Sequence, residues 1–272
     1  MTGLAHRGSD PVPAIREAEA SGDTAALFAD IRAVFGVGVV NLVWRHLAMF
    51  PGGLEWAWGS LRPIYVSGHA RAAADRLRAS LTLPALPMIA PEALAAAGVP
   101  PDKLPDIRAI LDAYDRTNPM ALVVLTLLQQ GASGAPPPPL HPTPEPPAVP
   151  LPPLPAMEEL PASTQALVLR LNALGAGPDA ILASMYRHLG HTPGYLALAW
   201  ALLAPLDMAA IIAAGQASAA REAAGLGGLL GAAPLPADPV AVQAALRRFT
   251  QDAIGRMVPI CALLRRVTPA FA

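Results

Sequence analysis

The chain has 272 residues, of which 53% are hydrophobic and 14% charged, with a formal net charge of −1. So few charges exclude an acidic or basic disordered tail protein. The near-neutral balance gives no electrostatic footprint for nucleic acid or for an anionic membrane. A single cysteine, Cys261, excludes a disulfide framework, a cysteine-ligated zinc site and a CxxC redox pair, and it favours a reducing, cytoplasmic location.

The first half of the chain has the pattern of short helices. Residues 1–22 are expected to form a partly flexible N-terminal segment, and they lack the unbroken apolar core of a signal peptide. From residue 23 to residue 130, apolar side chains recur every three or four positions, as in Leu27, Ile31 and Val34, and alternating strand patterns are almost absent. We therefore predict an all-α fold of about a dozen helices, each roughly 8 to 18 residues long and punctuated by proline.

A proline-rich segment follows, over residues 131–157. From Pro136 to Pro155, 12 of 20 residues are proline. Such a run adopts polyproline II, at about 3.1 Å per residue, and acts as a semi-rigid spacer. Its PxxP content could bind an SH3-like domain, but we favour a linker that lies outside any core.

The second half, residues 158–272, contains the longest apolar stretch, from Tyr195 to Ala214. Pro205 and Asp207 interrupt that stretch near its middle, whereas a membrane span needs about 20 apolar residues without such breaks. Two buried helices that meet at Pro205 are the better interpretation, so no membrane partner is expected.

The two halves resemble each other. A shift of 142 residues places Tyr186–Pro205 on Trp44–Pro63, with ten identities in the 19 positions from Arg45 to Pro63. Matched Arg-His, Pro-Gly and Trp residues carry more weight than matched alanine in this composition. We predict a tandem duplication of a helical unit of about 120 residues, packed as an intramolecular pseudo-dimer with a small-molecule pocket between the copies.

Few polar residues suggest chemistry. His46 and His188 are repeat equivalents, and His188 and His191 lie one helical turn apart. No HExxH motif or carboxylate cluster supplies a third and fourth metal ligand, so a structural role is favoured over a metal site. Asn118 precedes Pro119 where an apolar run begins, and we favour a helix N-cap for it over an amide that orients water and a carboxylate in a pocket.

The motifs VGVVNLVWRHLAMFPGGLEWAW (residues 37–58) and DRTNPMALVVLTLL (residues 115–128) resemble the group I 2-haloacid dehalogenases, of the DehI type. The likeness covers about residues 23–267. It implies two all-α repeats and a cofactor-free, metal-free hydrolysis, in which water held by an Asn and deprotonated by an Asp displaces halide from C2 of a short 2-halocarboxylic acid.

The resemblance also implies a set of site residues. Asn118 matches the family's water-orienting Asn. The cleft is expected to be lined by the following residues of the two copies: Val39, Asn41, Leu42, Ala121, Ala183, Ser184, Phe249, Thr250 and Ala253.

The chain departs from the family pattern at the catalytic base. The resemblance implies an Asp after Ala183 and Ser184, and the chain has Met185 there. Methionine has no titratable proton and is only a weak acceptor. If Asp179 is helical with Met185 it lies about 240° away around the helix, and Asp252 is closer to the cleft but has no geometric argument in its favour.

Two hypotheses follow from this departure. The chain is either a dehalogenase-type hydrolase with a displaced base or another substrate, or an inactive member that binds a small organic acid or serves as a structural protein. An AhpD-like peroxide reductase is disfavoured because it needs a second cysteine. The sequence leaves homodimer formation open.

Overall fold

The computed structural model describes residues 12–140, 149–177 and 180–270. Over these ranges the chain is all-α and contains no β-strand, which confirms the predicted fold class. The first half supplies α1 (Gly22–Phe35), α2 (Leu42–Leu47), α3 (Gly53–Val66), α4 (His69–Ser80), α5 (Pro91–Ala96) and α6 (Leu104–Gln130). The second half supplies α7 (Ala162–Asn172), α8 (Ser184–Leu189), α9 (Pro193–Leu203), α10 (Met208–Ala224), α11 (Pro239–Arg248) and α12 (Ile254–Val267).

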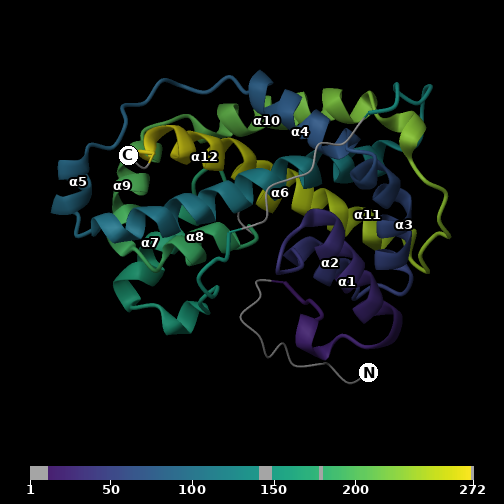
Figure 1. The fold of residues 1–272 in the computed structure, drawn as a ribbon, viewed down its shortest axis with the longest axis horizontal. Coiled ribbons are helices and arrows are strands. Elements are labelled where there is room, and N and C mark those ends of the chain that lie inside the picture. The colour runs from purple at the N-terminus through teal and green to yellow at the C-terminus, as the bar shows by residue number, and fades with distance from the viewer. Residues whose placement is uncertain (1–11, 141–148, 178–179, 271–272) are drawn as a thin grey trace.

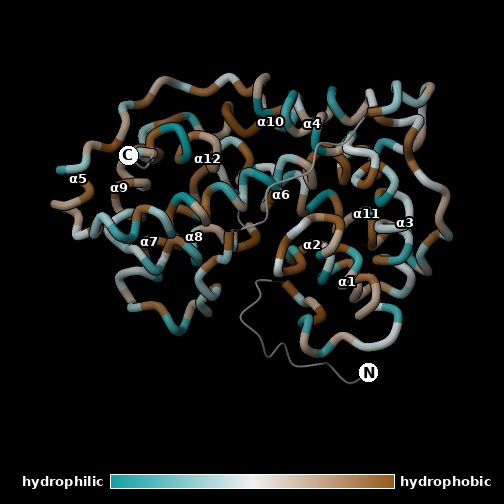
Figure 2. Tube along the Cα trace, in the orientation of Figure 1, coloured by the Kyte–Doolittle hydropathy of each residue, from teal (hydrophilic) through white to brown (hydrophobic). Residues whose placement is uncertain are grey.

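Two hydrophobic cores lie side by side, and α6 and α12 run through both of them (Figure 1). The first core holds α1–α4 and the second half of α6, and it includes Trp44 and Trp58. The second core holds α5, the first half of α6 and α7–α9. Apolar residues recur along helices at both ends of the molecule in Figure 2, as expected for two cores rather than one. Each core takes residues from both sides of the proline-rich segment.

Helix α6 corrects the predicted helix lengths. It extends over 27 residues and passes through Pro119, where the sequence pattern placed a helix start. A proline inside a helix has no N–H for the carbonyl four residues earlier, here that of Asp115. Arg78 on α4 replaces this donor, because its Nη1 lies 2.8 Å from the Asp115 carbonyl oxygen.

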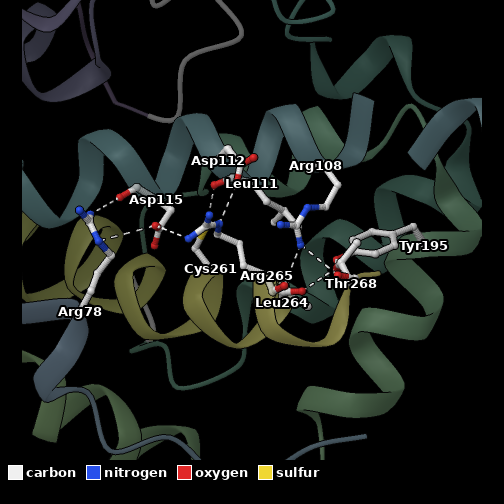
Figure 3. Close-up of polar contacts among 10 residues, drawn as sticks. All are labelled: Arg78, Arg108, Leu111, Asp112, Asp115, Tyr195, Cys261, Leu264, Arg265 and Thr268. Atoms are coloured by element: carbon white, nitrogen blue, oxygen red, sulfur yellow. Dashed lines mark hydrogen bonds and ion pairs between the residues drawn. The ribbon is translucent and has the colours of Figure 1, made fainter. Parts of the chain in front are cut away.

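The same side of α6 carries a polar cluster that joins three helices (Figure 3). Asp115 is buried, and its carboxylate accepts from Arg265 Nη1 of α12 at 2.6 Å and lies 3.8 Å from Arg78 Nε. Arg265 also pairs with Asp112 at 2.7 Å. The Cys261 thiol donates to the Leu111 carbonyl, so the one cysteine is a buried structural residue. These contacts hold α4 and α12 against α6.

The apolar stretch around Pro205 forms two helices, as predicted. Helix α9 ends at Leu203 and α10 begins at Met208, with the Asp207 side chain capping α10 by accepting from the Ala210 N–H at 3.1 Å. No single described helix is long and apolar enough to cross a membrane. Helices α9 and α10 together are long and apolar enough to span a membrane, but the chain bends by 90° between them.

The described parts of the proline-rich segment lie against the folded body, although none of their residues is a buried member of either hydrophobic core. Near its start, the Pro138 carbonyl accepts from His69 Nε2 at 3.0 Å. Near its end, Leu151 packs against the second core. The segment therefore lies along the body of the protein at both described ends. Proline has no N–H to donate, so carbonyl groups of the segment accept hydrogen bonds from side chains outside it.

We predict that the Arg78–Asp115 carbonyl bond stabilises α6 only because residue 119 is proline. Arg78→Met should lower the free energy of unfolding by about 1–3 kcal/mol, the cost of a buried carbonyl without a donor. In a Pro119→Ala background the backbone N–H restored at this position would satisfy that carbonyl, so the same substitution should cost about 1 kcal/mol less. Urea unfolding of the four variants measures this coupling, and equal losses in both backgrounds would contradict the assignment.

Candidate functional site

A cavity of about 620 Å³ lies where α2, α6, α8 and the start of α12 meet. Its walls are mostly apolar, and nine residues that the sequence analysis placed in the cleft line it together. These nine are Val39, Asn41, Leu42, Asn118, Ala183, Ser184, Met185, Phe249 and Ala253.

Helix α6 presents its polar residues to this cavity. Tyr114, Thr117 and Asn118 lie on one face of the helix, three and four positions apart, and all three line the cavity. Next to this face, Asn41 Nδ2 lies 3.5 Å from Thr117 Oγ1, at the outer limit of a hydrogen bond. The predicted N-cap role of Asn118 is wrong, because α6 begins fourteen residues earlier, at Leu104, and continues through Pro119.

Asn118 is a polar residue of the cavity wall whose side chain has no hydrogen-bond partner among the described residues. The residue is 7% exposed. Within the described part of the chain its amide makes no hydrogen bond. A buried amide with two donors and one acceptor normally has partners, because leaving them unmade costs free energy. An amide that faces a cavity in this way is suited to a bound ligand or water.

A buried arginine fixes the wall on the opposite side, just before α8. Arg256 of α12 is 1% exposed and donates to the Asn172 carbonyl at 2.6 Å, the Ile181 carbonyl at 2.9 Å and the Asp252 carboxylate at 2.6 Å. Asn172 Oδ1 also accepts from the Ala183 N–H at 3.0 Å. This network holds residues 181–183 in place and thereby positions Ser184 and Met185 at the start of α8.

No Asp or Glu is among the described residues that line the cavity. Met185, where the resemblance implies the base, is fully buried. Asp252 is engaged by Arg256 and by the Ile181 N–H, so it is a structural residue of the wall. Asp115 belongs to the polar cluster on the other side of α6. Asp179 lies outside the described residues.

His188 is the side chain of the cavity wall whose type most often serves as a general base in enzymes. Its Nε2 donates to the Pro152 carbonyl at 2.6 Å, and its Nδ1 lies 3.3 Å from the Tyr114 hydroxyl. Because a carbonyl only accepts, Nε2 carries the proton and Nδ1 accepts from Tyr114. Burial lowers the pKa of His188 and raises that of the Tyr114 phenol, so both groups are neutral near pH 7.

The histidines share one kind of partner. His46, His69, His188 and His191, the four that the structure describes, each bond through a ring nitrogen to the carbonyl of a proline. No group of three or more His, Cys, Asp or Glu side chains able to hold a metal ion is found among the described residues.

Two residues placed in the cleft by the resemblance lie elsewhere. Ala121 lies three positions after Asn118 on the same face of α6, but it is 2% exposed, packs in the first core and is not among the residues that line the cavity. Thr250 accepts from Gln129 Nε2 at 3.0 Å and donates to the Leu246 carbonyl, so it faces α6. A π-helical turn over Phe249–Ala253 directs Phe249 and Ala253, but not Thr250, toward the cavity.

The sequence analysis missed several lining residues. Tyr114 and Thr117 would follow from Asn118 by helical spacing once α6 is continued through Pro119. Arg45, which entered the sequence analysis only as part of the repeat, lines the cavity and donates through Nε to the Val40 carbonyl at 3.2 Å. Residues 149–154 of the proline-rich segment also line the cavity, and no sequence signal indicated this.

Comparison with known proteins points to one group. A configuration-inverting 2-haloacid dehalogenase from Alcaligenes xylosoxydans xylosoxydans is 32% identical over 120 residues, which cover 43% of this chain and 40% of the relative. The aligned part thus spans less than half of that relative. No protein-family model matches the chain.

Solved structures show the same fold over nearly the whole chain. A D-2-haloacid dehalogenase mutant matches with a TM-score of 0.73 and 21% identity, covering 94% of both chains. A mutant of that name in complex with D-2-CPA matches with a TM-score of 0.70 and 22% identity, again over 94% of both chains. A D-2-haloacid dehalogenase in complex with L-LA matches with a TM-score of 0.68 and 18% identity, over 95% of this chain and 96% of the other.

Burial of two histidines predicts acid sensitivity. Burial lowers the pKa of His46 and of His188 in the folded protein, so their contribution to stability is present above the pKa of an unfolded histidine and is lost as the pH falls. Between about pH 7 and pH 5 the free energy of unfolding should fall, by up to about 1.4 kcal/mol per pH unit for each histidine.

The His46→Gln/His188→Gln double variant should show a shallower fall in urea unfolding experiments over this range. Burial also raises the pKa of Asp115, and this shift makes the folded protein more stable as the pH falls. Because Asp115 is present in both the native chain and the double variant, its effect cancels when their two pH curves are compared. Parallel pH curves for the native chain and the double variant would contradict the assignment.

Proposed function

Because the chain groups with the 2-haloacid dehalogenases by its sequence and structural neighbours, we propose that it binds small 2-substituted organic acids in the Asn118 cavity without hydrolysing them. Two of the structural neighbours hold D-2-CPA and L-LA, which makes a small acid the natural first candidate for a ligand.

One observation carries the binding half of the proposal. Asn118 is 7% exposed, lines the cavity, and its side chain makes no hydrogen bond within the described residues. A carboxylate or a 2-substituent at this point would accept from its NH₂ group. Arg45 adds a positive charge to the same cavity, which favours an anionic ligand over a neutral one.

The proposal that the chain does not hydrolyse its ligand rests on Met185. The family resemblance implies a general base at this position, and a thioether cannot deprotonate water. General-base catalysis contributes about 10²–10⁴-fold to a rate. No carboxylate among the described lining residues replaces it. Both ring nitrogens of His188 are hydrogen-bonded, so a displaced base at this residue is the weaker alternative.

We also propose that the two halves arose by duplication, with units at about residues 23–130 and 158–272. Helix α2 begins at Leu42 and α8 at Ser184, 142 residues apart, the same offset as the sequence match. His46 and His188, which correspond at this offset, each bond to the carbonyl of a proline that precedes their own half, Pro13 and Pro152. The cavity then lies between the two related halves, which can present different residues to it.

Isothermal titration with 2-chloropropionate tests the binding site. Asn118→Ala should weaken binding by about tenfold or more, because a hydrogen bond to a charged group contributes about 1.5–3 kcal/mol. Gln130→Ala is the matched control, since it removes an exposed amide from the same helix outside the cavity. Equal affinity of the native chain and Asn118→Ala, or no binding at all, would contradict the proposed site.

Restoring an acid at residue 185 tests the missing base. Met185→Asp should release halide from 2-chloropropionate, while the native chain and the Met185→Leu control should not. The apolar cavity should raise the pKa of the new carboxyl, so the rate should increase with pH as this group loses its proton. Halide release by the native chain at the rate of the Asp variant would contradict the proposal.

A further inference from the structure

The proline-rich segment forms one wall of the cavity. Residues 149–154 line it together with Tyr114, Thr117 and Asn118 of α6. Leu151 also packs against the second core, so this wall is joined to the folded body rather than lying loosely over it. Val149 is 65% exposed and Leu154 39% exposed, which places them at the rim of the cavity.

Two histidines of the α8 region hold this wall in place. His188 Nε2 donates to the Pro152 carbonyl at 2.6 Å, and His191 Nε2 lies 2.7 Å from the Pro153 carbonyl. Pro152 and Pro153 have no N–H, so the segment cannot form helix or sheet bonds of its own there. Helix α8 thus carries Met185 at its start, and His188 near its end and His191 just after it bond to the proline-rich wall.

The cavity is large for a three-carbon acid. Its volume of about 620 Å³ lies within the range of sites for drug-sized ligands, about 300–1,000 Å³. The polar lining residues come from α2 and the residue before it, from α6 and from α8: Asn41, Arg45, Tyr114, Thr117, Asn118, Ser184 and His188. Valine, proline and leucine side chains make up the proline-rich wall. A ligand that satisfies Asn118 therefore leaves apolar space on the side of residues 149–154.

We propose that residues 149–154 determine ligand specificity, and that the ligand is a carboxylic acid whose C2 end lies at Asn118 and whose medium-length apolar chain packs on Leu151. This inference rests on the proposed function, because it takes Asn118 as the site of the acid end. It assigns to the proline-rich segment the selection of chain length, and to His188 and His191 the positioning of that segment.

A chain-length series tests the inference. Titration of the native chain with 2-chloropropionate, 2-chlorohexanoate and 2-chlorooctanoate should show affinity increasing by about fourfold for each methylene that is buried. Leu151→Ala should remove most of this increase, measured as the slope of binding free energy against chain length. His191→Ala, at an exposed residue, should reduce the increase without unfolding the protein. Leu235→Ala is the control, since Leu235 is 72% exposed and outside the cavity.

The outcomes separate the two proposals. If binding of every acid is unaffected by Asn118→Ala, or absent, the proposed function fails and this inference fails with it. If binding depends on Asn118 but affinity does not change with chain length, the specificity wall alone is contradicted. The same holds if Leu151→Ala and His191→Ala give the same chain-length dependence as Leu235→Ala.

Discussion

The continuity of α6 across Pro119 is the constraint on which the site depends. A proline at this position would end most helices, but Arg78 donates to the Asp115 carbonyl that Pro119 leaves without a partner. The helix therefore keeps its phase through residue 119, with Asp112 and Asp115 on one side and Tyr114, Thr117 and Asn118 on the other. One face joins α6 to α4 and α12, and the other builds the cavity.

The chemistry of the cavity follows from what these elements bring to it. Helix α6 supplies an unsatisfied amide, α2 supplies Asn41 and Arg45, and α8 supplies Met185. The buried Arg256 donates to the Ile181 carbonyl, in the segment before α8, and to the Asp252 carboxylate. Asp252 is therefore a structural partner of Arg256 rather than a candidate base. Arg45 and the Asn118 amide are the groups on which we base the proposed binding of an anion, and no carboxylate is among the described residues that line the cavity.

The sequence was informative where local patterns determine structure, and less so where distant contacts do. Helical spacing and proline punctuation predicted an all-α fold and the break at Pro205, and the family resemblance placed nine residues that line one cavity. The N-cap role of Asn118 was wrong, because the donor that allows α6 to pass Pro119 comes from Arg78, 41 positions earlier. The contacts of residues 149–154 were missed because composition predicts polyproline conformation but not which side chains its carbonyls meet.

Incubation of the native chain with 2-chloropropionate in ¹⁸O-labelled water, followed by mass spectrometry of the acid, tests the central claim most directly. If the cavity binds the acid and lacks a base, the protein should leave the chloro acid unchanged, with no labelled 2-hydroxy acid above the level formed without protein. Accumulation of labelled 2-hydroxypropionate over many turnovers, lost in Asn118→Ala, would show that this site activates water without an acid at residue 185 and would contradict the account.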